Sequence, residues 1–363
     1  MRLSRWLAAA SLGIGVPAAW AADGDAADWL LQMTDAARSV NYQGVVVYRG
    51  DDILETFRVV HRYGDGDERE RVQSLTGQVR EVLKDDNQVI CILPKDQRVT
   101  TDRPTPKGLF PSLDRKRLEQ LSEVYSMRDL GAARVAGRNC RGIEIRPRDE
   151  YRYGYEVWAD EVTAVPLKVS LLGEAGRILE QMFFTDIEFP ETIPDAAFQT
   201  AFDPETMRRV TIKSAGAISE SAAEDVGPVA GAPERHLDDA SLPPGFHVAM
   251  RETRTLPGGR GQMEHVLLSD GLSTISVFRS QQVVADDGGF EGVSQMGPLN
   301  AYGRVVGRMR VTVVGDVPPA TVRMIGDSFK MTPDHGLASS LMPGLDGKAP
   351  APVARHQPVK QTP

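Results

Sequence analysis

The sequence is poor in the residue types that build metal and catalytic centres. It has two cysteines, Cys91 and Cys140, and six histidines in 363 residues, and no histidine lies at ligand spacing from either cysteine. It contains no H-E-x-x-H, no paired C-x-x-C, no P-loop and no glycine fingerprint following a strand. We therefore expect a protein that is not an enzyme and that holds no cofactor and no metal.

Long apolar runs are scarce as well, and one of them lies at the N-terminus. Residues 1–21 carry Arg2 and Arg5, an apolar segment of 11 residues (6–16) and an Ala-Trp-Ala cleavage site. An N-terminal anchor is the alternative, but the segment is well short of the ~20 residues needed to span a bilayer. No cysteine follows the cleavage site, which argues against a lipoprotein. We expect an exported protein of the bacterial periplasm.

Positive charge is also in deficit. The net charge is −8, and removing Arg2 and Arg5 with the signal peptide changes it to −10. This argues against nucleic acid as a partner, because nucleic-acid sites need basic grooves. It is compatible with a basic peptide partner, although surface acidity in a secreted protein more often serves solubility alone. The remaining ~340 residues are too many for one core, and two domains are expected.

The two cysteines lie in apolar strand patterns, residues 89–93 and 140–145. In an oxidising compartment, a Cys91–Cys140 disulfide would close a loop of about 50 residues and contribute on the order of 4 kcal/mol. Two buried thiols on separate strands are the alternative, and both stay open.

Periodicity predicts a mostly β chain with few helices. Helices are expected at residues 25–40, 114–124 and 319–328. Roughly ten strands up to residue 190 indicate a strongly curved antiparallel sheet with two helices beside its mouth. An Asp270-Gly271 turn between alternating runs predicts a hairpin in the second domain. The expected organisation is a signal peptide (1–21), a large domain (22–213), a flexible linker (214–242), a small C-terminal domain (243–330) and a disordered tail (331–363).

The stretch 146–190 is the most informative part of the chain. Its three β-patterned runs, 151–158, 165–172 and 177–189, predict an antiparallel meander with large apolar side chains on both faces. Such a sheet either packs against the helices alone or leaves a groove for an acyl chain or an extended peptide. The candidate contact residues for a lipid or a partner are Tyr151, Tyr153, Tyr155, Trp158, Met182 and Phe184.

Several residues partly match catalytic motifs, but a structural role is the simpler explanation for each of them. Residues 292–297 resemble a nucleophile elbow that is one residue too long, and we expect a loop there. His61 and His265 lie in strand patterns and are expected to be structural. The acid pairs Asp149-Glu150 and Asp160-Glu161 fall at turns, where solvated charge is the ordinary expectation.

Several motifs in both halves of the chain resemble the RseB/MucB family. The large-domain motifs are Asn-Tyr-Gln-Gly at 41–44, Leu-Thr-Gly at 75–77, Arg-Glu-Val at 80–82 and Arg-Tyr-Gly-Tyr-Glu-Val-Trp at 152–158. The small-domain motifs are His-Val-Leu-Leu-Ser-Asp-Gly-Leu at 265–272, Ser-Val-Phe at 276–278 and Val-Thr-Val-Val-Gly-Asp-Val-Pro at 311–318. The similarity covers residues 25–330, with both domains in the family's order.

The resemblance implies an α+β fold that is mostly β. The large domain would be a curved half-barrel similar to the carriers LolA and LolB, with helices in its mouth, and the small domain would be mixed α/β. It implies a periplasmic negative regulator of a sigma-E (AlgU-type) stress response. Such a protein binds the periplasmic segment of an RseA/MucA-like anti-sigma factor, shields it from site-1 proteolysis and releases it on sensing lipid or lipopolysaccharide. A lipid or lipoprotein carrier is the alternative, a homo-oligomer stays open, and a hydrolase would need a nucleophile that the sequence does not reveal.

Overall fold

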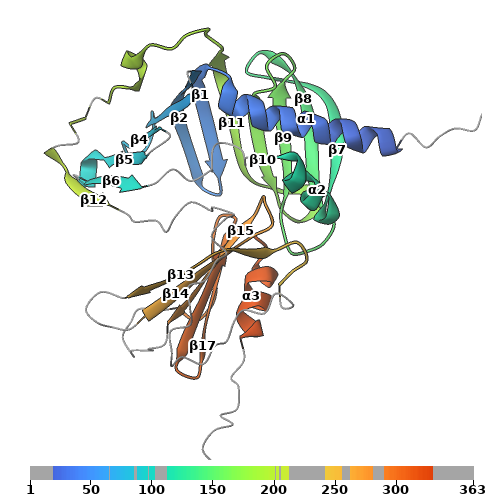
Figure 1. Cartoon of the computed structure of the whole chain (residues 1–363), viewed down its shortest axis with the longest axis vertical. Helices are drawn as coiled ribbons and strands as arrows, with labels where there is room; N and C mark the ends of the chain where they lie inside the picture. The colour runs from blue at the N-terminus through green and yellow to red at the C-terminus, as the bar shows by residue number, and fades with distance from the viewer. Residues whose placement is uncertain are drawn as a thin grey trace, which may run out of the picture. The chain divides into compact units, whose positions relative to one another are not determined.

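The structure is a computed structural model, and its described part is mostly β-sheet with three α-helices (Figure 1). It describes residues 19–64, 66–85, 88–96, 98–102, 113–200, 202–203, 206–211, 242–255, 262–280 and 290–329. Most of the predicted signal peptide, all of the predicted linker except Leu242, and the predicted tail lie outside these residues.

The larger sheet has twelve strands in the order β12-β6-β5-β4-β3-β2-β1-β11-β10-β9-β8-β7. All neighbours are antiparallel except β12 and β6, which run parallel. Pairing of β1 with β11 joins the two ends of the large domain, with Val46 opposite Phe184. The strands are β1 (Tyr42–Gly50), β2 (Ile53–Gly64), β3 (Asp67–Ser74), β4 (Glu81–Lys84), β5 (Val89–Leu93), β6 (Arg98–Asp102), β7 (Tyr125–Val135), β8 (Arg138–Pro147), β9 (Gly154–Asp160), β10 (Pro166–Leu172), β11 (Ile178–Glu188) and β12 (Arg208–Thr211).

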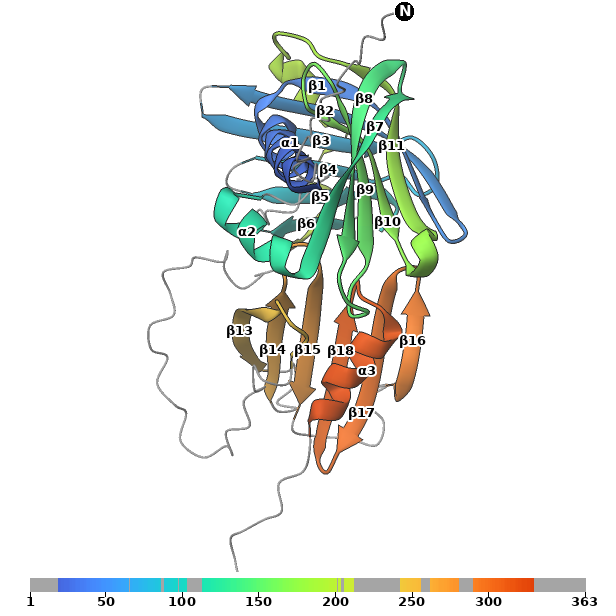
Figure 2. The same cartoon turned by 90° about the vertical axis from the view of Figure 1, so that its right-hand side faces the viewer.

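Two helices pack against one face of this sheet, which we call the concave face, and the sheet curves around α1 (Figure 2). Helix α1 (Ala19–Ser39) begins six residues before the predicted start and buries Leu30 and Met33 completely. Helix α2 (Arg115–Val124) begins where predicted, because the side chain of Asp114 caps it by accepting from the N–H of Arg117 at 2.7 Å. The mostly β class and the open half-barrel with helices in its mouth are confirmed.

The meander at 146–190 is confirmed, with one boundary error. The first strand begins at Gly154 rather than at residue 151, because residues 149–153 form a loop that reaches the second domain. The β9–β10 turn is tight, and its Asp160 is only 1% exposed. Asp160 accepts from the N–H groups of Val162 and Thr163 and from Nε of Arg138 at 2.6 Å. The expectation of a solvated charge at Asp160 is therefore wrong.

The smaller sheet has six antiparallel strands in the order β13-β14-β15-β18-β17-β16, and α3 covers one face of it (Figure 2). Its core is separate from that of the large domain and is centred on Val266, Ile275, Val313 and Ile325. The Asp-Gly hairpin is confirmed, as is α3 at its predicted bounds. The elements are β13 (His247–Thr255), β14 (Gln262–Ser269), β15 (Thr274–Ser280), β16 (Gly292–Met296), β17 (Leu299–Val306), β18 (Met309–Gly315) and α3 (Pro319–Ser328).

Of the two alternatives left open for Cys91 and Cys140, the structure shows separate thiols and not the disulfide. The two thiols are not joined: Cys91 lies on β5 and Cys140, completely buried, on β8. Seven strands separate β5 from β8 in the sheet order. A disulfide needs Cα atoms within about 7 Å, whereas adjacent strands alone are ~4.8 Å apart. Burial raises the pKa of the Cys140 thiol, which opposes formation of a reactive thiolate.

Candidate functional site

The sheet register divides the six predicted contact residues into three groups. The first group, Tyr155, Met182 and Phe184, lies on the concave face. Tyr155 pairs with Leu171 across β9 and β10, and Met182 pairs with Val169 across β11 and β10. Phe184 is 3% exposed and meets the ring of Tyr42 edge-on, while Tyr155 and Met182 pack partly buried against the same core. These three side chains face the apolar interior between the sheet and the helices.

Trp158 lies on the opposite face of β9 from Tyr155 and Val157. Its ring covers Gly142 so closely that a Cβ there would lie 2.6 Å from a ring carbon. Its Nε1 donates to Oε1 of Glu156 at 2.5 Å. Alternation along the strand predicts that Trp158 lies on the face opposite Tyr155, and the structure confirms it.

Tyr151 and Tyr153 form the third group, in the loop before β9, and both contact the small domain. The hydroxyl of Tyr153 accepts from Nδ2 of Asn300 at 3.0 Å, and burial raises the pKa of this phenol. The carbonyl of Tyr151 accepts from the hydroxyl of Thr321 at 2.9 Å. These contacts place Tyr151 and Tyr153 at the junction between the domains rather than in a lipid groove.

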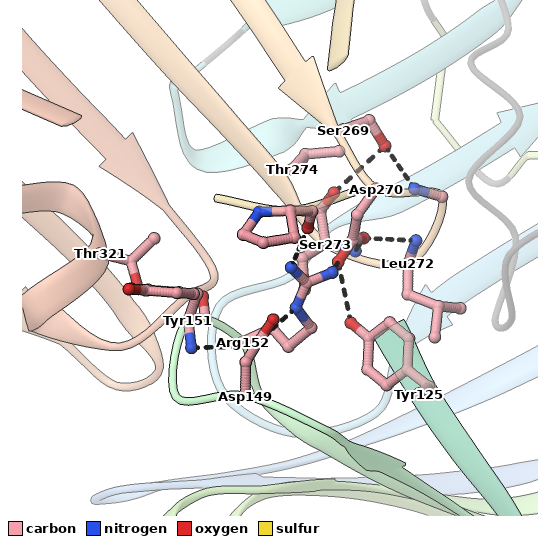
Figure 3. A network of polar contacts seen from close by, with 12 residues as sticks. Tyr125, Asp149, Tyr151, Arg152, Ser269, Asp270, Leu272, Ser273, Thr274 and Thr321 are labelled. Atoms are coloured by element: carbon pink, nitrogen blue, oxygen red, sulfur yellow. Dashed lines mark hydrogen bonds and ion pairs between the residues drawn. The ribbon is translucent and has the colours of Figure 1, made fainter. Parts of the chain in front are cut away.

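Arg152 is the centre of a buried polar network at this junction (Figure 3). Its Nη1 lies 2.8 Å from Oδ2 of Asp270, and neither side chain has any exposed area. Its Nε donates to Asp149 at 3.0 Å, and its Nη2 donates to the carbonyl of Pro244. The hydroxyl of Tyr125 donates to the same Asp270 oxygen at 3.0 Å. Burial, with the charge of Asp270, raises the pKa of Tyr125, so this phenol stays a donor.

Asp270 is held equally firmly from its own hairpin. Its Oδ1 accepts from the N–H groups of Leu272 at 3.0 Å and Ser273 at 2.7 Å. The turn requires Gly271, whose φ is +99°. The guanidinium of Arg152 also lies over the ring of Phe246, 4.9 Å from its centre. A buried ion pair stabilises a fold only when its other donors and acceptors are satisfied, and here they are.

Sequence patterns alone did not reveal this network. The Asp-Gly signal identified the hairpin correctly, and an arginine inside an aromatic run was visible at Arg152. Neither signal says which acid pairs with which base, because Arg152 and Asp270 are 118 positions apart in the chain. The contact depends on the packing of two different sheets against each other.

A second polar cluster lies at the end of α1. His61 is 1% exposed and stacks on Tyr42, with ring centres 4.7 Å apart. Its Nδ1 lies 2.9 Å from the carbonyl of Val40, which can only accept, so Nδ1 is the donor in this contact. Its Nε2 faces Oε1 of Glu68 at 3.6 Å, and Nζ of Lys84 lies 2.7 Å from the same oxygen. The contact with His61, with Lys84 adding to it, lowers the pKa of Glu68 from 4.5 to about 2.

We expect Glu68→Gln to remove part of the protein's acid sensitivity. Because the pKa of Glu68 is lower in the folded state, its stabilising contribution is complete above pH 4.5 and is lost as the pH falls toward 2. Wild type should therefore lose more stability than the variant across this window, measured as Tm against pH. The control is Glu119→Gln on the exposed side of α2, which should follow the wild-type curve. Parallel curves for wild type and Glu68→Gln would contradict the assignment.

The small domain contains a serine, a histidine and a carboxylate in a row across three strands. Nε2 of His265 lies 3.1 Å from Oγ of Ser276, and its Nδ1 lies 3.4 Å from Oε1 of Glu252. Ser276 stands in the middle of β15, which pairs with β14 on one side and β18 on the other. The ladders therefore engage the backbone N–H groups that would have to stabilise an oxyanion beside it. We interpret the row as a cross-strand hydrogen-bond chain. Residues 292–296 are strand β16 rather than the expected loop.

Both parts of the chain match a known family. The MucB/RseB N-terminal domain matches residues 25–202, and the MucB/RseB C-terminal domain matches residues 233–330.

The chain belongs to the MucB/RseB family.

The relatives span nearly the whole chain. The "Sigma factor AlgU regulatory protein MucB" of Pseudomonas aeruginosa is 31% identical over 326 residues, which is 87% of this chain and 94% of that protein. The "Sigma-E factor regulatory protein RseB" of Salmonella typhimurium is 28% identical over 327 residues, or 89% of this chain and 96% of that protein. The resemblance drawn from the sequence motifs is thereby confirmed.

A solved structure agrees with the MucB/RseB assignment. The structure of the Pseudomonas aeruginosa MucA/MucB complex aligns with a TM-score of 0.60 and 28% identity, covering 83% of this chain and 97% of that one. The MucB/RseB relatives are named regulatory proteins. Within the part of this chain that the structure describes, no helix has the length and apolarity that crossing a membrane requires.

Proposed function

We propose that this chain is a periplasmic negative regulator of a sigma-E-type envelope stress response. It binds the periplasmic segment of a membrane-bound anti-sigma factor, shields that segment from the site-1 protease and releases it on sensing lipid or lipopolysaccharide. The observation that carries the proposal is the similarity, along both domains, to MucB in the MucA/MucB complex.

The proposed mechanism is competitive binding rather than catalysis. A protease needs its target segment extended and accessible, so a protein that covers the segment blocks cleavage without changing any bond. A segment that becomes ordered on binding loses conformational entropy, which keeps the affinity modest. A lipid can then release it, provided that the lipid binds the released state more tightly than the segment-bound state.

The concave face is the surface that we assign to the acyl chains. Tyr155, Met182 and Phe184 share it with the inner sides of α1 and α2. Acyl chains need apolar area and few polar groups, and this face supplies both conditions. Tyr151 and Tyr153 contact the small domain, so we assign them to holding the two domains together. Trp158, on the other face of the sheet, takes no part in the acyl site.

A protease-protection assay tests the proposal. The mature chain, residues 22–363, is mixed with the periplasmic segment of a MucA-like anti-sigma factor, and site-1 protease cleavage is followed over time. With the chain at about ten times its Kd, the free segment and hence the cleavage rate should fall about tenfold. Lipopolysaccharide should restore cleavage, whereas deacylated lipopolysaccharide, the matched control, should not. Cleavage at the same rate with and without the chain would refute the proposal.

A lipid or lipoprotein carrier is the second candidate, favoured by the apolar concave face. A carrier delivers acyl chains to acceptor vesicles and leaves the anti-sigma segment open to cleavage. Deleting the small domain does not separate the two candidates, because Leu272 of that domain is part of the large domain's core. The protection assay separates them with the intact chain.

A further inference from the structure

The tip of the β14–β15 hairpin enters the core of the large domain. Leu272, 7% exposed, belongs to a cluster of buried residues whose other members all come from the large domain. Among the described residues, the two domains thus share apolar packing as well as the Arg152–Asp270 pair. We call residues 270–273 the plug.

Helix α2 is the element against which the plug rests. Its inner side buries Leu118, Leu121 and Val124. A Cβ at Gly271 would lie 3.6 Å from Leu121, and a Cβ at Gly245 would lie 2.9 Å from Val124. Both small-domain glycines thus approach α2 closely enough that a movement of the helix by the width of one side chain would break the packing.

The C-terminus of α2 is also connected to the polar network. Tyr125 follows the last helical residue, and its N–H donates to the carbonyl of Leu121 while its hydroxyl donates to Asp270. Arg148 donates from its N–H to the carbonyl of Val124 at 2.9 Å and from Nε to that of Tyr125 at 3.1 Å. Arg148 lies four positions before Arg152 in the same loop. A displaced α2 would therefore carry with it both large-domain groups that bind Asp270.

Helix α2 is also the weaker of the two covers on the concave face. It has 10 residues and buries three apolar side chains, whereas α1 has 21 residues and buries Ala26, Trp29, Leu30, Met33 and Ala36. Protein interiors are close-packed, so an acyl chain enters this face only by displacing side chains that fill it. Helix α2, which buries less apolar surface than α1, is therefore displaced first.

We propose that an acyl ligand on the concave face displaces α2, and that α2 in turn unseats the plug and separates the small domain from the large one. This inference rests on the proposed function, in which an acyl ligand is the releasing signal. It adds the contacts through which an acyl ligand bound in the large domain changes the position of the small domain. The plug and the ion pair make the response two-state, because Arg152 and Asp270 find all their partners only when the plug is seated.

The experiment measures ligand binding and domain separation independently. Spin labels are attached at Val162→Cys in the large domain and Met296→Cys in the small domain, both strongly exposed positions, in a Cys91→Ser, Cys140→Ala background. Anthroyloxy-stearate serves as the probe, with its fluorescence reporting binding and the spin-label distance reporting separation. We expect saturating probe to replace the single distance of the free protein with a longer, broader distribution.

Two variants and a control sharpen the test. Leu121→Ala weakens the packing of the plug against α2. Each tenfold decrease in the population with the plug packed against α2 lowers the half-saturating probe concentration by up to about tenfold. Glu119→Ala, on the exposed side of the same helix, should behave as the unsubstituted protein. Met182→Trp fills the concave face and should abolish both binding and separation, whereas Phe183→Trp, on the other face of β11, should abolish neither.

The outcomes distinguish this inference from the function on which it rests. Probe binding with an unchanged spin-label distance overturns the inference, and acyl-dependent release of the anti-sigma segment in the protection assay would then leave the proposed function intact. If the probe does not bind at all, the proposal that an acyl ligand is the releasing signal is refuted, and this inference is refuted with it. Equal half-saturation for Leu121→Ala and Glu119→Ala would show that α2 is not the coupling element.

Discussion

Asp270→Ala is expected to lower the free energy of unfolding by about 3–5 kcal/mol, the range for removing one partner of a buried ion pair. The substitution leaves the guanidinium of Arg152 without its main counter-charge at a position with no solvent exposure. It also removes the acceptor of Tyr125 and of two N–H groups in the hairpin. Denaturant unfolding followed by circular dichroism measures the loss.

The matched control is an ion pair of the same chemistry at the surface. Arg115 and Asp28 lie 3.3 Å apart with side chains 71% and 58% exposed. Arg115→Ala should cost less than about 1 kcal/mol, because water solvates the remaining charge. If Asp270→Ala proved no more costly than this control, the junction would not be a buried network in solution.

The double variant Arg152→Met, Asp270→Leu separates the charge from the packing. Removing both charges abolishes the unpaired-charge penalty, so the double variant should be more stable than Asp270→Ala. The apolar plug, with Leu272 in the core, remains in place.

Leu30→Ala is expected to lower the free energy of unfolding by about 2–5 kcal/mol, through lost burial and the cavity left behind. Leu30 has no exposed area and lies on the side of α1 that faces the sheet. An apolar cavity stays dry and accepts apolar guests. Anthroyloxy-stearate should therefore recover part of the lost stability and bind this variant more tightly than wild type.

Val162→Ala is the control for Leu30→Ala. It deletes a smaller apolar group at a position that is 86% exposed, in the β9–β10 turn. Its effect should lie within about 0.5 kcal/mol, and fatty acid should not change it. A tighter fatty-acid affinity in Val162→Ala as well as in Leu30→Ala would mean that the binding is not at the concave face.

The elements predicted well from the sequence are those specified by nearby residues. Helix α2 begins after a capping Asp114, α3 begins with a proline, and the β14–β15 hairpin turns at Asp-Gly. The errors occur where contacts between segments far apart in the chain determine the secondary structure. Strand β12 exists only by pairing with β6, and the meander's first strand begins late because residues 149–153 contact the small domain.

In the candidate site, too, local patterns predicted some features and long-range contacts determined the others. Alternation along β9 and β11 placed Tyr155 and Val157 on one face and Trp158 on the other, because side chains alternate across any strand. Which face the helices cover does not follow from alternation. The disulfide stayed open at the level of the sequence for a related reason: apolar strands around both cysteines are equally compatible with neighbouring strands and with strands far apart in one sheet.

The sequence by itself determined the fold class, the order of the domains and the family, because periodicity, turn residues and motifs are local and survive without coordinates. Only the tertiary structure decided that Arg152 pairs with Asp270, that Leu272 completes the large domain's core and that α2 packs against the small domain. These contacts join residues more than 100 positions apart, and their partners are selected by the docking of two folded sheets. No local pattern encodes that choice.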